Sequence, residues 1–231
     1  MQRTSIITDS GVVLGTFARR AALPLTILPN QITTARGTFF ESEEHSNEKA
    51  LALLAQSPSP AILESPSPET YSNAFATLAR DVDEIICICP SRQLLPHWEN
   101  ANRAIRMTPG ICPIRLIDSQ LISGGQTLAT LAIADAVAKE DHINDIERLA
   151  RSIAAHTYLM IAIDEVEKLR LVESMGAQHA LFSAMLNIKP IISMENGLLH
   201  AVAKARSRAH AIDRLLEFAT EFIDAAYVLI L

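Results

Sequence analysis

Two short polar segments place a carboxylate beside a hydroxyl group directly after an apolar run: Thr8-Asp9-Ser10-Gly11 and Ile117-Asp118-Ser119. If the apolar runs are strands of a parallel sheet, both segments lie outside the carboxyl edge of that sheet, where ligands bind in open α/β folds. The same residue types also cap helices and close turns. Both segments are therefore candidates either for a ligand site or for ordinary loop structure.

A glycine pair lies in Ser123-Gly124-Gly125-Gln126, at the start of a predicted helix whose free backbone amides could hold an anion. The segment lacks the third glycine of a dinucleotide-binding loop and the Gly-Lys-Ser/Thr ending of a P-loop. The chain contains no Gly-x-Ser-x-Gly elbow, no His-Glu-x-x-His pair and no clear pair of acids. We therefore predict a binding protein that is not an enzyme and uses no cofactor. The alternative is an enzyme for a small molecule or phosphate that uses Asp9, Asp118 and the glycine pair.

Three cysteines, Cys87, Cys89 and Cys112, lie in or beside apolar runs. Together with His97 they could supply four ligands, but their spacing matches no structural zinc motif. Because Cys87 and Cys89 alternate with isoleucines, they would fill one face of a strand that is buried on both sides. We predict buried thiols and no metal site.

The composition of the 231 residues indicates a globular fold packed mainly by aliphatic side chains, because 49% are hydrophobic and only 5% are aromatic. A formal charge of -6 gives no electrostatic reason to expect nucleic acid or an anionic membrane as a partner. No apolar run approaches the roughly 18 residues that span a bilayer, and the N-terminus lacks the layout of a signal peptide. We predict a cytoplasmic protein with no transmembrane segment and no nucleic-acid partner.

The segments that must position the polar residues alternate between short apolar runs and amphipathic ones. One predicted helix begins after Ser67, which suits a helix cap before Pro68, and two more cover residues 123–138 and 143–155. The predicted strands are residues 5–8, 24–28, 85–89, 114–117 and 158–163. This alternation predicts a largely parallel sheet covered by helices. The polar stretch 30–47 interrupts it, and the Pro/Ser-rich stretch 57–68 is predicted to be an ordered loop.

The pattern changes after Ala155, which predicts an N-terminal α/β domain of residues 1–155 and a smaller α+β domain of residues 156–231, incomplete at its C-terminus. Asn196-Gly197 is a strong two-residue hairpin signal after the apolar, β-branched run Ile188 to Met194. Pro190 suits an edge strand or the first residues of a strand. The other predicted elements are helices over 165–171, 177–186 and 207–225 and a final strand over 227–231.

The segment Leu186 to Ile192 closely resembles the L-N-I-K-P-I-L segment of the DegV family, bacterial proteins that bind a fatty acid and present its head group to a partner kinase. Other segments resemble motifs of that family in the same order along almost the whole chain. They are Ile6 to Ser10 for V-T-D-S, Ser65 to Pro68 for the end of T-T-S-Q-P-S-P, Ile117 to Ser119 for the D-S strand end, Asp164 to Leu169 for D-x-L-x-x-L, and Lys204 to Ala209 for K-x-R-x-R-K-K. The resemblance implies an α/β domain and an α+β domain that bury an acyl chain between or beneath them.

The chain departs from the family pattern in the loops that grip the lipid head group. Leu63 and Glu64 stand where the T-T-S-Q-P-S loop has threonine and serine. Leu95 stands where the S-S-G-L-S-G-T loop has the serine that would hold the carboxylate. Ser174 replaces the arginine of the G-G-R-I run, and the family usually continues past the position of Leu231 to a G-T-H-x-G-x-G segment.

The resemblance implies a non-catalytic protein that binds a long-chain fatty acid or another acyl lipid, with the ATP-binding subunit of a fatty acid kinase as its partner. The alternative is a DegV-fold interaction or scaffold protein that has lost lipid binding, because Leu63 and Leu95 would fill the head-group site. A buried carboxylate needs a replacement partner, and Arg92 is the best candidate. The predicted lipid-binding residues are Leu63, Ser65, Ser91, Arg92, Leu95 and His97.

Overall fold

Four parallel strands form the sheet that the apolar runs predict. The computed structural model describes residues 3–13, 25–35, 37–41, 52, 56, 61–139, 143–164 and 188–231. In the order β2-β1-β6-β7, the strands are Leu25–Leu28, Thr4–Asp9, Glu84–Cys89 and Ile114–Asp118. Every neighbouring pair is parallel, so the predicted α/β class is confirmed.

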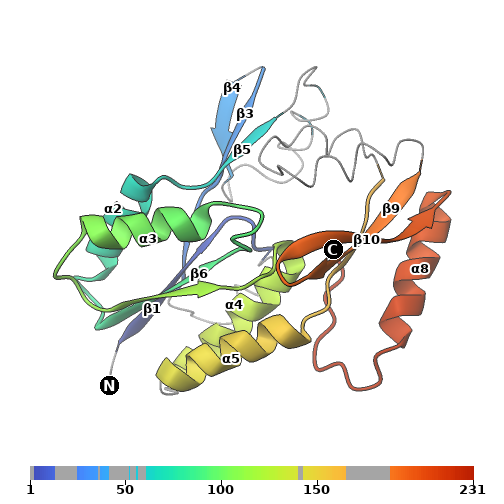
Figure 1. Ribbon diagram of the computed structural model, residues 1–231. Coiled ribbons are helices and arrows are strands. Elements are labelled where there is room, and N and C mark those ends of the chain that lie inside the picture. The colour runs from blue at the N-terminus through green and yellow to red at the C-terminus, as the bar shows by residue number, and fades with distance from the viewer. Residues whose placement is uncertain are drawn as a thin grey trace.

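Helices cover both faces of this sheet (Figure 1). Helices α2 (Pro68–Leu78) and α3 (His97–Met107) pack on the face that carries Cys87 and Cys89, whose Sγ atoms lie 3.9 Å apart. Helices α4 (Ser123–Ala138) and α5 (Ile143–His156) pack on the opposite face. Because β6 is buried on both faces, the prediction that the two cysteines fill one face of a strand is confirmed.

Helix α2 begins as its sequence predicts, whereas α3 was not anticipated. The Ser67 hydroxyl accepts a hydrogen bond from the Thr70 amide at 3.2 Å, and Pro68 is the first helical residue. Helix α3 buries small side chains, Ala101 and Ala104, beside His97. Trp98 and Ile105 pack against the same cluster, so α3 has one apolar face at helical spacing that the sequence prediction missed.

A small antiparallel sheet in the order β4-β3-β5 occupies part of the polar stretch 30–47 and of the Pro/Ser-rich stretch 57–68 (Figure 1). Its strands are β3 (Gln31–Thr34), β4 (Gly37–Phe40) and β5 (Ile62–Glu64). The loop prediction for residues 57–68 is wrong for β5, and no strand was predicted within residues 30–47. Strands of three or four residues with largely exposed side chains carry little hydrophobic signal, and their pairing depends on contacts distant in the sequence.

The hairpin prediction is confirmed. Strands β9 (Lys189–Glu195) and β10 (Leu198–Ala205) pair in antiparallel register around Asn196 and Gly197, whose φ angles are 51° and 80°. Two successive positive φ angles are typical of the tight turn that Asn-Gly favours. Strand β8 (Met160–Ala162) pairs with β9, so β9 is the central strand of the sheet and Pro190 lies near its beginning instead of on an edge.

The C-terminal part differs from two sequence predictions. Helix α8 (Arg208–Thr220) ends five residues before the predicted end at Ala225, and residues 227–231 form no strand. The side chains of Tyr227 and Ile230 are exposed, so this apolar run lacks the strand partner that its β propensity requires. The helices predicted over 165–171 and 177–186 lie outside the described residues.

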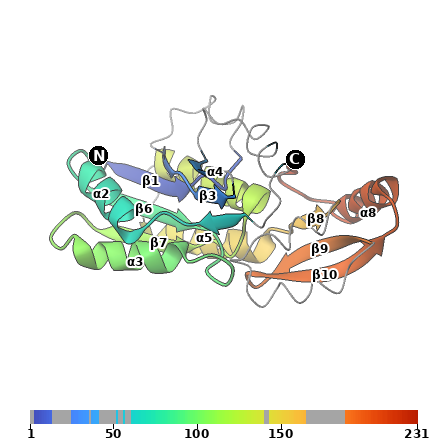
Figure 2. The ribbon, with the colours of Figure 1, turned by 90° about the horizontal axis from the view of Figure 1, so that it is seen from above.

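The hairpin turn contacts the parallel sheet through one buried hydrogen bond. The Ser91 hydroxyl, in the loop after β6, donates to the Gly197 carbonyl oxygen at 2.6 Å. In Figure 2 the turn of β9 and β10 points toward the α/β part of the molecule. An apolar cluster accompanies this bond, and its buried members are Leu94, Ile192, Met194 and Leu199.

We predict that Gly197→Ala destabilises the protein by about 2 to 4 kcal/mol, because alanine disfavours this positive φ and its Cβ would lie 2.6 Å from the Ser91 hydroxyl oxygen. The matched control is Gly110→Ala, which has a φ of 83° but no atom within 4 Å of the added Cβ, and should cost only about 1 to 2 kcal/mol. Urea denaturation measures both. Equal losses would show that the turn is not tightly packed against Ser91.

Candidate functional site

Asp9 is the centre of a buried polar network at the carboxyl edge of the parallel sheet. Only 1% of the residue is exposed. Its Oδ1 accepts a hydrogen bond from Gln126 Nε2 at 2.7 Å, and its Oδ2 accepts from Asn30 Nδ2 at 3.0 Å and from the Gly11 amide at 2.8 Å. These three donors satisfy the two oxygens of this carboxylate. Asp9 therefore joins the loop after β1 to the segment after β2 and to helix α4.

A second layer of the network lies beside Asp9. The Ser10 hydroxyl donates to Glu41 Oε2 at 2.7 Å and accepts from the Asn30 amide at 2.8 Å. Asn30 also donates from Nδ2 to Glu41 at 3.1 Å. The sequence reasoning missed Asn30 and Gln126. Asn30 follows Pro29 directly after a predicted strand. A polar residue at that place lies at the carboxyl edge of the sheet, and this placement could have identified Asn30 as a candidate.

The second polar segment, around Asp118, closes loops. Asp118 Oδ1 accepts from the amides of Gln120 at 3.0 Å and Arg92 at 3.3 Å. The Ser119 hydroxyl accepts from the Leu121 amide at 3.2 Å. The turn interpretation of this segment is therefore the one that the structure supports.

The glycine pair allows close packing at the start of α4. A Cβ on Gly124 would lie 3.1 Å from Leu231 Cδ1, and one on Gly125 would lie 3.2 Å from Leu121 Cδ2. Apolar side chains thus cover the first turn of the helix, where an anion would have to approach. The geometry gives no support to a phosphate site at this position.

His97 and Tyr71 form a buried pair between α3 and α2. The Tyr71 hydroxyl lies 3.0 Å from His97 Nδ1, and His97 is completely buried. Burial lowers the pKa of His97, and the nearby Asp9 carboxylate opposes that shift. His97 Nε2 has no hydrogen-bond partner among the described residues. The pair therefore contains a neutral imidazole with one unused nitrogen.

Two of the other predicted residues lie at the hairpin, one is bonded to α3, and one lies in the small antiparallel sheet. Ser91 binds Gly197, and Leu95 packs against the apolar cluster of the hairpin. Ser65 accepts a hydrogen bond from Asn100 of α3 at 2.8 Å. Leu63 lies opposite Ile32 in the small antiparallel sheet and is half-buried. Ser174, one of the departures from the family pattern, lies outside the described residues.

Arg92 is engaged on the outer surface of α3. Its Nη2 lies 2.9 Å from Glu99 Oε1, and its guanidinium carbon lies 4.1 Å from the centre of the Trp98 ring. The Arg92 side chain is 43% exposed. To reach a buried head group, the guanidinium would have to leave both partners.

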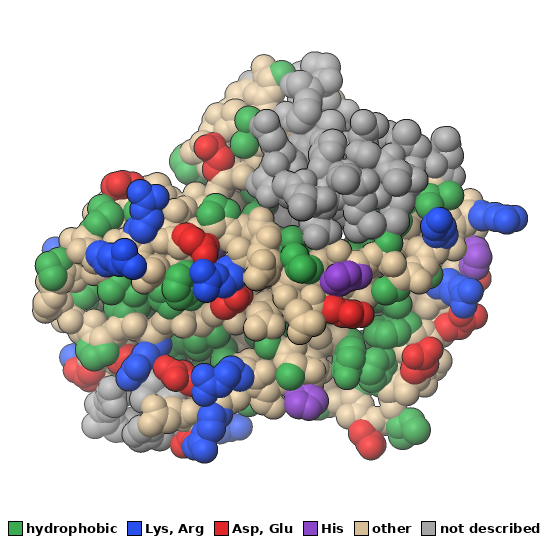
Figure 3. Space-filling model, in the orientation of Figure 1, with side chains coloured by type: hydrophobic (Ala, Val, Ile, Leu, Met, Phe, Trp, Pro, Cys, Tyr) green, Lys and Arg blue, Asp and Glu red, His purple; other side chains and the backbone are tan. Residues whose placement is uncertain are grey.

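A hollow of about 260 Å³ lies on the other face of the β8–β10 sheet, against α8. Apolar Met160, Ile191 and Phe218 line it together with Arg214 and Glu217, whose charged groups lie 3.0 Å apart. None of the predicted lipid-binding residues lines this hollow. Figure 3 shows apolar side chains at the surface beside the lower end of α8. The hollow is therefore separate from the Ser91–His97 loop.

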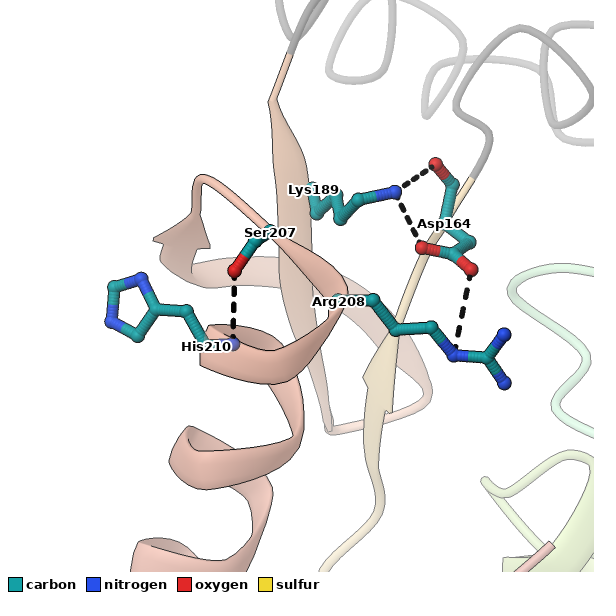
Figure 4. A network of polar contacts seen from close by, with 5 residues as sticks. All are labelled: Asp164, Lys189, Ser207, Arg208 and His210. Carbon is teal, nitrogen blue, oxygen red and sulfur yellow. Dashed lines mark hydrogen bonds and ion pairs between the residues drawn. The ribbon is translucent and has the colours of Figure 1, made fainter.

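Three segments that resemble family motifs meet in one polar network (Figure 4). Lys189 Nζ donates to the Asp164 carbonyl oxygen at 3.0 Å and to its carboxylate. Arg208 Nε lies 3.8 Å from the same carboxylate, and the Ser207 hydroxyl caps α8. The hydrogen bond from Lys189 lowers the pKa of Asp164. These residues join β8, β9 and α8, which makes their role architectural.

In the part of the chain that the structure describes, no group of three or more His, Cys, Asp and Glu side chains is arranged to hold a metal ion. No helix there combines the length and the apolar character needed to cross a membrane.

The family model of the uncharacterised DegV proteins matches residues 3–227. The chain therefore belongs to the DegV family. A DegV domain-containing protein of Streptomyces coelicolor is 27% identical over 225 residues, which are 95% of this chain and 77% of that protein.

Solved structures of DegV proteins share the fold. A fatty-acid-binding DegV family protein of Thermus thermophilus superposes with a TM-score of 0.80 at 18% identity, over 95% of this chain and 77% of that one. The fatty acid kinase B3 protein of Streptococcus pneumoniae, loaded with linoleic acid, superposes with a TM-score of 0.77 at 19% identity, over 95% and 78%.

We predict that His97 makes stability depend on pH. Because burial lowers the pKa of His97 in the folded protein, the unfolded chain binds the proton more readily. Stability should therefore fall as the pH drops through about 6.5, the usual pKa of histidine. Urea denaturation at pH 5, 6 and 7 should show a smaller fall for His97→Gln than for the exposed control His210→Gln. The same pH dependence in both variants would contradict the prediction.

Proposed function

We propose that this protein binds a fatty acid or another acyl lipid and catalyses no reaction. The observation that carries the proposal is the shared fold with DegV proteins that bind fatty acids, at TM-scores of 0.77 to 0.80 over at least 95% of this chain. Membership of the DegV family supports it. A cytoplasmic location is part of the same proposal.

The proposed place for the acyl chain is the apolar cluster between the Ser91–His97 loop and the hairpin sheet. Leu94 and Leu95 contribute to this cluster from the loop, and Ile192 and Met194 contribute from β9. We treat residues 1–155 and 156–231 as two domains whose contact holds the lipid. Ser65 and Leu63 would border the head-group end, because they precede α2 and Ser65 is bonded to α3.

The energetics favour retention of lipid binding despite the changed head-group loops. Burying a chain of roughly 14 methylenes contributes about 11 kcal/mol before association costs. One hydrogen bond to a charged group contributes only about 1.5 to 3 kcal/mol. Changes at Leu63 and Leu95 should therefore alter the preferred head group more than the ability to bind an acyl chain.

A kinase partner is the further part of this proposal. The Streptococcus pneumoniae neighbour is named as a fatty acid kinase B3 protein. By analogy with that protein, we propose that this chain presents its lipid to an ATP-binding kinase subunit. Isolation of a stable complex between this chain and such a subunit of the same organism would test the analogy.

We predict that protein purified from a heterologous host carries acyl lipid, which mass spectrometry of organic extracts will detect. Leu95→Gln should reduce the bound lipid several-fold, because it places a polar amide against the apolar cluster. The matched control is Leu216→Gln, which makes the same change at a position on α8 that is 55% exposed. The control should carry as much lipid as the original protein.

The alternative, a DegV-fold scaffold that has lost its ligand, predicts a different result. Neither purified protein nor protein offered fatty acids of 12 to 18 carbons would retain lipid in that case. That outcome would refute lipid binding.

A second prediction concerns Arg92 as the carboxylate partner. Arg92→Met should weaken binding of charged fatty acids more than binding of neutral lipids, because only the former need a cation. Competition binding with a fatty acid and the matching fatty alcohol measures the two effects. Equal effects would show that the guanidinium keeps its place between Glu99 and Trp98.

A further inference from the structure

We propose that α8 is a self-association surface, which packs in parallel orientation against α8 of a second copy of this chain. The proposal goes beyond lipid binding and does not depend on it. Its starting point is a row of exposed apolar side chains, the outer stripe, which consists of Ala209, Ile212, Leu216 and Ala219. Among the side chains that the structure describes, α8 is the one helix with two large apolar residues exposed, Ile212 at 47% and Leu216 at 55%. Exposed apolar patches of this kind commonly mark interaction sites.

The outer stripe plays no part in the packing of α8 on its own sheet. A second row, Ala211, Leu215 and Phe218, either packs against the hairpin sheet or lines the hollow beside it. Because each residue turns the helix by about 100°, the outer stripe lies roughly 110° around α8 from this inner row. The helix therefore has two separate apolar faces, and only one of them is covered.

The spacing of the outer stripe suits a helix partner. Its members follow one another at intervals of three, four and three residues, which is the spacing of a coiled-coil seam. A parallel pair about a two-fold axis would place Ile212 and Leu216 each against the same residue of the second copy. The alanines at both ends of the stripe allow the two helix backbones to approach closely.

The position of α8 in the molecule leaves room for this pairing. In both ribbon views α8 lies at the outer edge, beyond the hairpin sheet and far from the parallel sheet (Figures 1 and 2). Since the inner row points about a third of a turn away from the outer stripe, a two-fold axis parallel to α8 places the two molecules on opposite sides of the helix pair. The two copies therefore do not collide.

The charges beside the outer stripe favour a second copy as the occupant. Arg208 and Asp213 flank the stripe on opposite sides and are five residues apart, like the residues that form ion pairs between parallel helices of a coiled coil. In a parallel pair, Arg208 of each copy would face Asp213 of the other, so the surface complements itself. An antiparallel pair would instead bring the two Asp213 carboxylates together.

Both charged groups are accessible for this contact. The Arg208 side chain is 78% exposed, and its Nε lies 3.8 Å from the Asp164 carboxylate. Asp213 is exposed as well. Ion pairs at such positions contribute little stability but determine the orientation of the helices.

The expected association is weak, because each copy contributes one helix of 13 residues. An interface of this kind falls below the roughly 1,200 Å² at which stable protein interfaces begin. We expect a dimer with a dissociation constant of about 10 to 100 µM.

Sedimentation equilibrium of the full chain between about 5 and 500 µM tests the proposal across that range. Ile212→Lys places a charge within the outer stripe of both copies and should weaken the dimer at least about tenfold. The matched control is Val202→Lys on β10, because Val202 is 46% exposed but lies outside the outer stripe. The control should leave the dissociation constant unchanged. Leu216→Lys repeats the test if circular dichroism shows that Ile212→Lys does not fold.

Asp213→Asn tests the orientation of the helices. It should weaken a parallel dimer about threefold, because two ion pairs are lost, whereas an antiparallel dimer should become tighter. A tighter dimer would overturn the parallel arrangement. A monomer over the whole concentration range, an assembly of more than two copies, or a dimer that Ile212→Lys weakens no more than Val202→Lys would overturn the proposal, while the test of lipid binding would stand unaffected.

Discussion

The structure depends on the docking of one tight turn against one buried serine. Ser91 extends from the end of β6, and its hydroxyl reaches the Gly197 carbonyl oxygen across 106 residues of sequence. The turn can come this close only because Gly197 has no side chain and adopts a positive φ. The contact positions the hairpin sheet over the loop that carries Leu95 and His97. This hydrogen bond therefore joins the apolar cluster of the hairpin to the polar edge of the parallel sheet.

The polar edge itself is mostly satisfied internally. Asp9 is surrounded by donors, Asp118 and Ser119 close their own loops, and the glycine pair of α4 is covered by apolar side chains. Conspicuous motif residues at this edge are therefore architectural. Among the described residues, buried atoms without a hydrogen-bond partner include Asn30 Oδ1 and Gln126 Oε1 beside Asp9, and His97 Nε2. Chemistry at such an edge is best sought where a buried polar atom lacks a partner.

The segments that resemble family motifs also contain residues with a structural role. Asp164, Lys189 and Arg208 come from three segments that resemble the family, and they meet in one network that joins β8, β9 and α8. These residues assemble the sheet and say nothing of the loops in which the sequence departs from the family motifs. A family resemblance carried by scaffold residues predicts fold much more strongly than it predicts the ligand.

The sequence by itself determined the strands and helices with strong periodicity, the Asn-Gly hairpin and the cap of α2, because these depend on residues close together in the chain. It also determined membership of the family through ordered short motifs. The tertiary structure alone decided the small β4-β3-β5 sheet and the central position of β9. It also decided that Arg92 faces Glu99 and Trp98 while His97 is buried against Tyr71. Arg92 lies in the loop before α3 and His97 is the first residue of that helix, and only packing against α2 and the sheet determines which of them reaches the interior.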